Sequence, residues 1–89
     1  MKILCVCGMG FGSSLLLKMT AERALQKKGV SAEVEATDIG TASSVKADLI
    51  LTNNEFASQL QGGPTPVKAI KNMASEDEVA EVIDAFLNE

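Results

Sequence analysis

The chain has 89 residues and a net charge of −4, from eight basic and twelve acidic side chains. This length accommodates one hydrophobic core, so we expect a single domain over residues 1–89, and the composition (46% hydrophobic, 22% charged) is typical of a globular protein. Because acidic side chains outnumber basic ones, we expect no basic surface that could bind the phosphate backbone of a nucleic acid. No nucleic-acid partner is therefore expected.

The chain begins with an apolar run that is interrupted by glycine at position 8. Lys2–Val6 is rich in Ile, Leu and Val, which predicts a strand buried on both faces. The run is too short for a signal-peptide core or a membrane span, so we expect a cytoplasmic protein. The chain has two cysteines and no histidine, which is too few ligands for tetrahedral zinc. No metal and no other cofactor is expected.

Good helix formers follow the glycine-rich loop. They predict a helix over Ser13–Lys28 with Gly29 as its C-terminal cap and Gly12 or Ser13 as its N-terminal cap. Its buried stripe is predicted to contain Leu17, Ala21, Ala24 and Leu25.

Two more strands are predicted in the middle of the chain. Apolar and polar residues alternate over Val30–Thr37, which indicates a half-buried strand at a sheet edge. Asp38–Gly40 is predicted to be a turn, and Asp48–Thr52 is a further short apolar strand. The two asparagines that follow it, Asn53 and Asn54, could line a site, but they are expected to cap a brief helix.

The last elements are a short helix, a strand and a longer helix. We predict the short helix over Glu55–Leu60 and a strand over Pro66–Ile70, where proline is tolerated at the first residue. Ser75–Glu78 matches a capping box, in which each end residue bonds to the main chain of the other. It opens a helix that continues to Leu87.

This order of strands and helices predicts the α/β class. We expect a small four-stranded parallel sheet flanked by helices, a Rossmann-like or flavodoxin-like unit of three layers. In such sheets, ligands bind outside the carboxyl ends of the strands, where the strand order reverses. The loop after the first strand occupies such a place.

That loop begins with Cys7, the predicted reactive residue. Alternate glycines allow several main-chain amides to converge on one point, and the following helix adds the partial positive charge of its N-terminus. Both features stabilise a phosphate or a thiolate, and the thiolate is the nucleophilic form of cysteine. The predicted phosphate-binding residues are Gly8, Met9, Gly10, Phe11, Gly12, Ser13 and Ser14.

Other interpretations of the loop remain. Cys7 could simply pack at the end of a strand, as Cys5 is expected to do as an inert core thiol. A dinucleotide-binding loop would need a third glycine where Ser13 stands. Low-molecular-weight phosphatases and arsenate reductases place an arginine at that same position, whereas the single arginine here is Arg23. Without it, hydrolysis of a phosphocysteine should be slow.

The run from Cys7 to Ser14, followed by Leu15-Leu16-Leu17-Lys18-Met19, resembles the enzyme IIB component of the sugar phosphotransferase system, in its ascorbate-type branch and near the lactose and galactitol types. The resemblance is specific in the loop. It implies that Cys7 accepts a phosphoryl group from a phosphohistidine on a IIA component. The group would then pass to a carbohydrate bound by a membrane IIC component.

The resemblance also implies two protein partners, IIA and IIC, with contact to the membrane only through IIC. Met9 and Phe11 are then either loop packing or an exposed apolar rim for docking, and the same question applies to the nearby apolar residues Leu15, Leu16 and Met19. A non-catalytic IIB-like interaction module is a further alternative.

Overall fold

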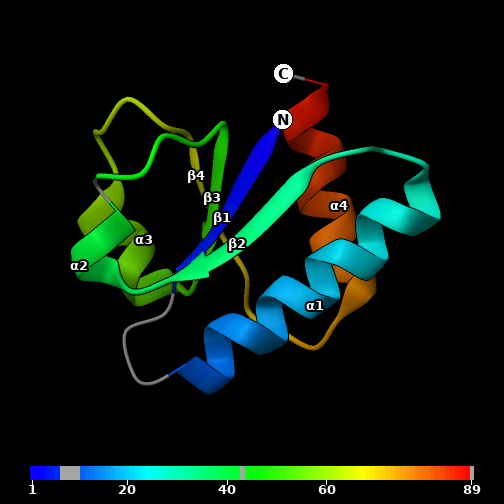
Figure 1. Ribbon diagram of the computed structural model, residues 1–89, viewed down its shortest axis with the longest axis horizontal. Coiled ribbons are helices and arrows are strands. Elements are labelled where there is room, and N and C mark those ends of the chain that lie inside the picture. Colours follow the sequence, from blue (N-terminus) through cyan, green and yellow to red (C-terminus); the bar gives the residue numbers. More distant parts are fainter. Residues whose placement is uncertain (7–10, 43, 89) are drawn as a thin grey trace.

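The computed structural model describes residues 1–6, 11–42 and 44–88, with the backbone alone described over 11–14. Its centre is a four-stranded, wholly parallel sheet in the order β2-β1-β3-β4 (Figure 1). The predicted four-stranded parallel sheet is therefore confirmed. The strands are β1 Lys2–Val6, β2 Glu33–Thr37, β3 Leu49–Thr52 and β4 Val67–Ala69.

Helices cover both faces of this sheet, which confirms the three predicted layers. The two long helices, α1 (Phe11–Lys28) and α4 (Glu76–Leu87), pack together on one face. The two short ones, α2 (Ile39–Ala42) and α3 (Asn54–Leu60), lie on the other (Figure 1).

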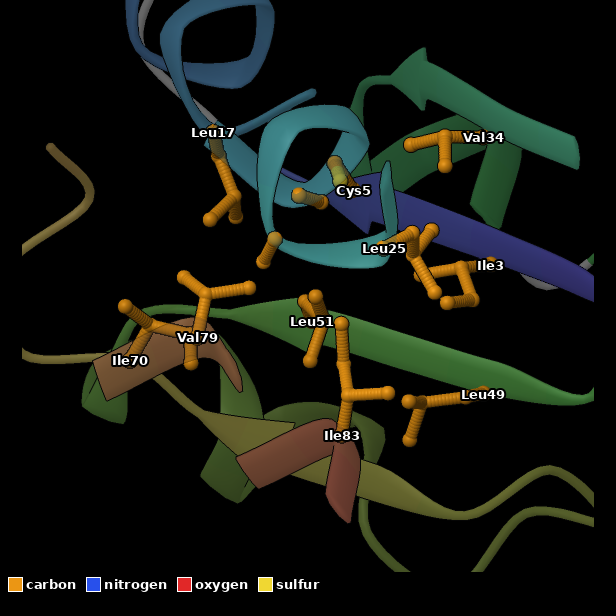
Figure 2. Close-up of a cluster of buried hydrophobic side chains, with 12 residues drawn as sticks. Ile3, Cys5, Leu17, Leu25, Val34, Leu49, Leu51, Ile70, Val79 and Ile83 are labelled. Carbon is orange, nitrogen blue, oxygen red and sulfur yellow. The ribbon is translucent and has the colours of Figure 1, made fainter. Parts of the chain in front are cut away.

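The central strand β1 is buried on both faces, as predicted from its apolar run. Ile3 and Cys5 belong to the larger core cluster, together with residues of α1 and α4 (Figure 2). Leu4 and Val6 belong to a second cluster on the α2 and α3 face. All four side chains are fully buried. The predicted place of Cys5 in the core is therefore confirmed.

Helix α1 ends in a glycine cap, as predicted. Gly29 has φ +70°, and its N–H donates to the Gln26 carbonyl at 3.2 Å. The N–H of Val30 donates to the Leu25 carbonyl at 3.0 Å, which completes a Schellman motif. The predicted stripe of α1 is buried: Leu17, Ala21, Ala24 and Leu25.

This cap explains why β2 is shorter than predicted. The strand was expected from Val30, but Val30 closes the helix end and packs half-buried against the core, so strand pairing begins only at Glu33. The edge position of β2 is confirmed. The turn predicted at Asp38–Gly40 is instead the start of the short helix α2, because the Asp38 carboxylate accepts the Thr41 N–H at 2.8 Å.

The capping box predicted at α4 is only half formed. Ser75 Oγ accepts the N–H of Glu78 at 3.1 Å, which is the expected N-cap bond. The Glu78 carboxylate, however, accepts the N–H groups of Lys71 and Asn72 at 2.6 and 2.9 Å. The loop after β4 presents these two amides, and the carboxylate therefore holds that loop against α4.

Charges lie along the edge strand β2. Lys2 Nζ is 3.3 Å from a carboxylate oxygen of Glu35 and 3.5 Å from one of Glu33. The hydrogen bond to Glu35, followed by the charges of both carboxylates, raises the pKa of Lys2 above its ordinary value of 10.5. Charged side chains at an exposed edge also disfavour pairing with another chain.

Replacing Gly29 by alanine should lower the free energy of unfolding by about 1 to 2 kcal/mol, the usual cost of a left-handed conformation for a residue with Cβ. No atom would lie within 4 Å of that Cβ, so the backbone conformation alone causes the loss. Urea unfolding measures it. The matched control is Gly63→Ala, since Gly63 does not have a positive φ and its Cβ would make an ordinary contact of 3.6 Å. Equal stability of the two variants would contradict this account.

Candidate functional site

The predicted reactive loop connects the first strand to the first helix. β1 ends at Val6 and α1 begins at Phe11. The predicted site residues Cys7, Gly8, Met9 and Gly10 lie outside the described residues. The other four, Phe11, Gly12, Ser13 and Ser14, have their backbone in the first turn of α1.

The carboxyl ends of β1 and β3 lie where the strand order reverses, which is the edge at which open parallel sheets bind ligands. From β1 the chain continues through α1 to β2 on one side, and from β3 it continues through α3 to β4 on the other. The order therefore reverses between β1 and β3, and the loops that leave these two strands diverge there. Ligands of open parallel sheets bind in the crevice that results.

The N-terminus of α1 contributes a favourable potential at this edge. The first four N–H groups of a helix have no acceptor within the helix, and here three of them belong to residues 11–13. The first turn carries no acidic side chain, so the helix dipole is not neutralised there.

The prediction that Gly12 or Ser13 caps the helix was wrong, because both lie inside its first turn. A glycine in a helix costs only about 1 kcal/mol, and the packing of the later turns outweighs it.

Thr52 is a residue of this edge that the sequence analysis missed. It ends β3 and is fully buried, and its Oγ1 donates a hydrogen bond of 2.8 Å to the carbonyl of Val6. Thr52 thus contacts the last residue of β1, which directly precedes Cys7 in the chain. Threonine is common in strands, and nothing in the sequence distinguished this one from its apolar neighbours.

Asn53 follows Thr52, and its predicted capping role is confirmed. Its Oδ1 accepts the Phe56 N–H at 2.8 Å, which makes it the N-cap of α3. Asp38, which follows β2, is likewise engaged in capping α2. The polar side chains that follow β2 and β3 therefore begin helices.

Arg23 is too far along α1 to act at the reactive loop. Arg23 lies twelve positions after Phe11, which corresponds to about 18 Å along the helix axis at the usual rise. Its guanidinium is instead 4.0 Å from the carboxylate of Glu76 at the start of α4. The arginine that a phosphatase loop of this type needs is therefore not supplied by α1.

Three apolar side chains of α1 point away from the core. Leu15, Leu16 and Met19 are 51%, 45% and 44% exposed, and they lie within the first half of the helix. We call these three residues the apolar patch. Contiguous exposed apolar side chains of this kind are typical of contact surfaces.

Two cavities formed by described residues lie elsewhere. One, of about 480 Å³, is bordered by the outer side of α1 and the loop before β2. The other, of about 380 Å³, lies beside the loops that precede β3 and β4.

Within residues 1–6, 11–42 and 44–88, no cluster of three or more His, Cys, Asp or Glu side chains is arranged to bind a metal ion. In the same part of the chain, no helix is both long and apolar enough to span a membrane.

Comparison with known proteins identifies the family that this architecture matches. A family model described as "PTS system, Lactose/Cellobiose specific IIB subunit" matches residues 2–85. The ascorbate-specific PTS system EIIB component of Mycoplasma pneumoniae is 26% identical over 88 residues, covering 96% of this chain and 93% of that protein. The protein of the same description from Salmonella choleraesuis is 31% identical over 77 residues, covering 83% and 76%.

A solved structure supports the same architecture. The solution structure of an enzyme IIB subunit of the PTS system from Escherichia coli K12 superposes with a TM-score of 0.58. The alignment covers 98% of this chain and 89% of that one, at 14% sequence identity. At this level of identity, the likeness concerns the fold.

Replacing Asn53 by alanine should lower the free energy of unfolding by about 1 kcal/mol, because the Phe56 N–H loses its acceptor. Thermal or urea unfolding measures the loss. Asn54→Ala is the matched control, since Asn54 is exposed and already inside the helix. If the two variants were equally stable, Asn53 would not be the cap.

Proposed function

Because the chain belongs to the lactose/cellobiose-specific IIB family of the sugar phosphotransferase system, whose members act in sugar phosphotransfer together with IIA and IIC components, we propose that Cys7 is its phosphoryl acceptor. The observation that carries the proposal is the position of the loop. It starts directly after Val6 at the reversal of strand order and ends at the free amides of α1.

The proposed reaction has two transfers. The Cys7 thiolate attacks the phosphorus of a phosphohistidine on IIA, so that an S–P bond forms and the P–N bond breaks. The electron pair stays on the imidazole nitrogen, which takes up a proton. A hydroxyl of the carbohydrate bound by IIC then attacks the same phosphorus and gives up its proton to solvent, and the S–P bond breaks to regenerate the thiolate.

The cradle for the phosphoryl group would consist of main-chain amides from Gly8 to Ser14. The amides of the first turn of α1 favour both the thiolate and the negatively charged phosphocysteine. Arg23 is paired with Glu76 and lies far along the helix, which supports a carrier over a phosphatase. Without a guanidinium at the loop, water would attack the phosphocysteine slowly.

Both partners must reach Cys7, and the apolar patch supports a docking role. Leu15 and Leu16 are in the second turn of α1, close in sequence to the loop, and are about half exposed. A single surface that serves IIA and IIC in turn would keep both donor and acceptor near the thiol. Met9 and Phe11 would extend this surface.

The cellular arrangement follows from these partners. Residues 1–89 would act as a single EIIB domain in the cytoplasm, with the membrane approached only through IIC. The ascorbate-specific description of the two relatives suggests an ascorbate-like substrate for the system. In this scheme the carbohydrate is held by IIC.

Incubation with phosphoenolpyruvate, the general phosphotransferase proteins and a cognate IIA should place one phosphate on the chain, at Cys7. Cys7→Ser should abolish this cysteine-linked phosphate. Cys5→Ala is the matched control and should still be labelled, because Cys5 is fully buried in the core. Mass spectrometry with fragment mapping measures the site. Labelling that persists in Cys7→Ser, or binding of IIA without any phosphate uptake, would overturn the proposal.

Replacing Leu16 by glutamate should raise the KM for phospho-IIA by about tenfold, as expected when a charge enters an apolar contact. Steady-state kinetics of Cys7 labelling at varied phospho-IIA measure this change. Leu87→Glu is the matched control, since Leu87 is 43% exposed and lies at the last turn of α4, away from the start of α1 (Figure 1). An unchanged KM for Leu16→Glu would exclude the patch as the docking surface for IIA.

A further inference from the structure

We propose that Thr52 is a positioning residue for Cys7, a role that rests on the proposed phosphoryl transfer. Thr52 Oγ1 donates its hydrogen bond to the Val6 carbonyl at 2.8 Å, and the side chain is fully buried. The Val6 carbonyl oxygen belongs to the same planar peptide unit as the N–H of Cys7. The hydroxyl therefore fixes the orientation of the peptide plane through which the chain enters the reactive loop.

The hydrogen bond can orient this peptide plane because it lies at the end of the β1–β3 pairing. The last registered pair between β1 and β3 is Cys5 with Leu51. One residue beyond this pair, the side chain of Thr52 connects the two strand ends. Pairing with β3 ends at Cys5, whereas pairing with β2 continues to Val6 opposite Thr37. The hydroxyl adds a restraint from the β3 side at Val6, the residue that precedes the loop.

Thr52 also connects the neighbouring strand to the same point. Its carbonyl accepts the N–H of Ile70 at 2.7 Å, just beyond the end of β4. One residue thus ties together the carboxyl ends of β1, β3 and β4. Ile70 is itself almost fully buried, so this side of the edge is anchored in the core.

The chemistry of the side chain argues for more than packing. The strand runs Leu49-Ile50-Leu51-Thr52, and valine would have nearly the same shape as threonine at its end. Burying a hydroxyl costs free energy unless it is hydrogen-bonded. The acceptor of the Thr52 hydroxyl is the carbonyl of Val6, the residue before the proposed nucleophile Cys7. A small error in the placement of a reacting atom lowers a rate strongly, so this bond is expected to affect catalysis.

The experiment compares Thr52→Val, which removes the hydroxyl at nearly constant shape, with Thr52→Ser, which keeps it. Thr20→Val is the matched control, because Thr20 is also buried and its Oγ1 donates a bond of 2.9 Å to a carbonyl, that of Leu16 within α1. All variants are made in a Cys5→Ala background, so that Cys7 is the only thiol. Urea unfolding reports stability for each.

Two readouts are measured on the folded proteins: the rate of Cys7 phosphorylation by phospho-IIA, and the pH profile of Cys7 alkylation by iodoacetamide. Thr52→Val should slow phosphorylation by about fivefold to tenfold and shift the alkylation profile to higher pH. Thr52→Ser and Thr20→Val should stay within about twofold of the Cys5→Ala parent in rate and keep its profile.

The proposal is overturned if Thr52→Val matches Thr20→Val in both readouts, since the hydroxyl would then act on stability alone. If Thr52→Val does not fold, Thr52→Ala replaces it and is compared with Thr52→Ser, because both lack the methyl group and differ in the hydroxyl. The alkylation profile needs no partner protein. A parent that accepts no phosphate would therefore contradict the proposed function, while the profiles would still decide the role of Thr52.

Discussion

The burial of β1 on both faces is the constraint on which the rest of the structure depends. Ile3 and Cys5 pack toward the long helices, and Leu4 and Val6 toward the short ones, with no exposed side chain among the four. Full burial of such side chains supplies about 1.5 to 3 kcal/mol each for the larger ones. The strand is thereby held in the centre of the sheet, and its carboxyl end is among the best-anchored points of the molecule.

A loop that carries the proposed nucleophile is held more firmly when it starts at a well-anchored strand end, such as the carboxyl end of β1. The residue after Val6 is Cys7, and the hydrogen bond from Thr52 joins the end of β1 to β3 at that point. On the other side of the loop, α1 is anchored by its buried stripe and by the Schellman cap at Gly29. Both ends of the loop are therefore attached to rigid elements, which is the arrangement expected where glycine-rich backbone must bind an anion.

Helix α1 serves the core and the surface at once. Leu17, Ala21 and Leu25 fill the space against the sheet, whereas Leu15, Leu16 and Met19 remain exposed. A surface helix needs only one buried stripe, so the additional apolar side chains are not required by the fold. Their position near the start of the helix is consistent with a carrier that must contact a donor and an acceptor in turn.

Local chemistry in the sequence determined the α/β class, the apolar strand at Lys2–Val6, the glycine cap at Gly29 and the Asn53 cap, because each depends on neighbouring residues. Tertiary structure decided what depends on contacts distant in sequence. Glu78 is 6 and 7 residues from the amides that it accepts, and Thr52 is 46 residues from Val6. Only the folded chain brings such partners together. The sequence could therefore indicate Cys7 as the predicted reactive residue, but it could not indicate the Thr52 hydroxyl that bonds to the end of β1 just before Cys7.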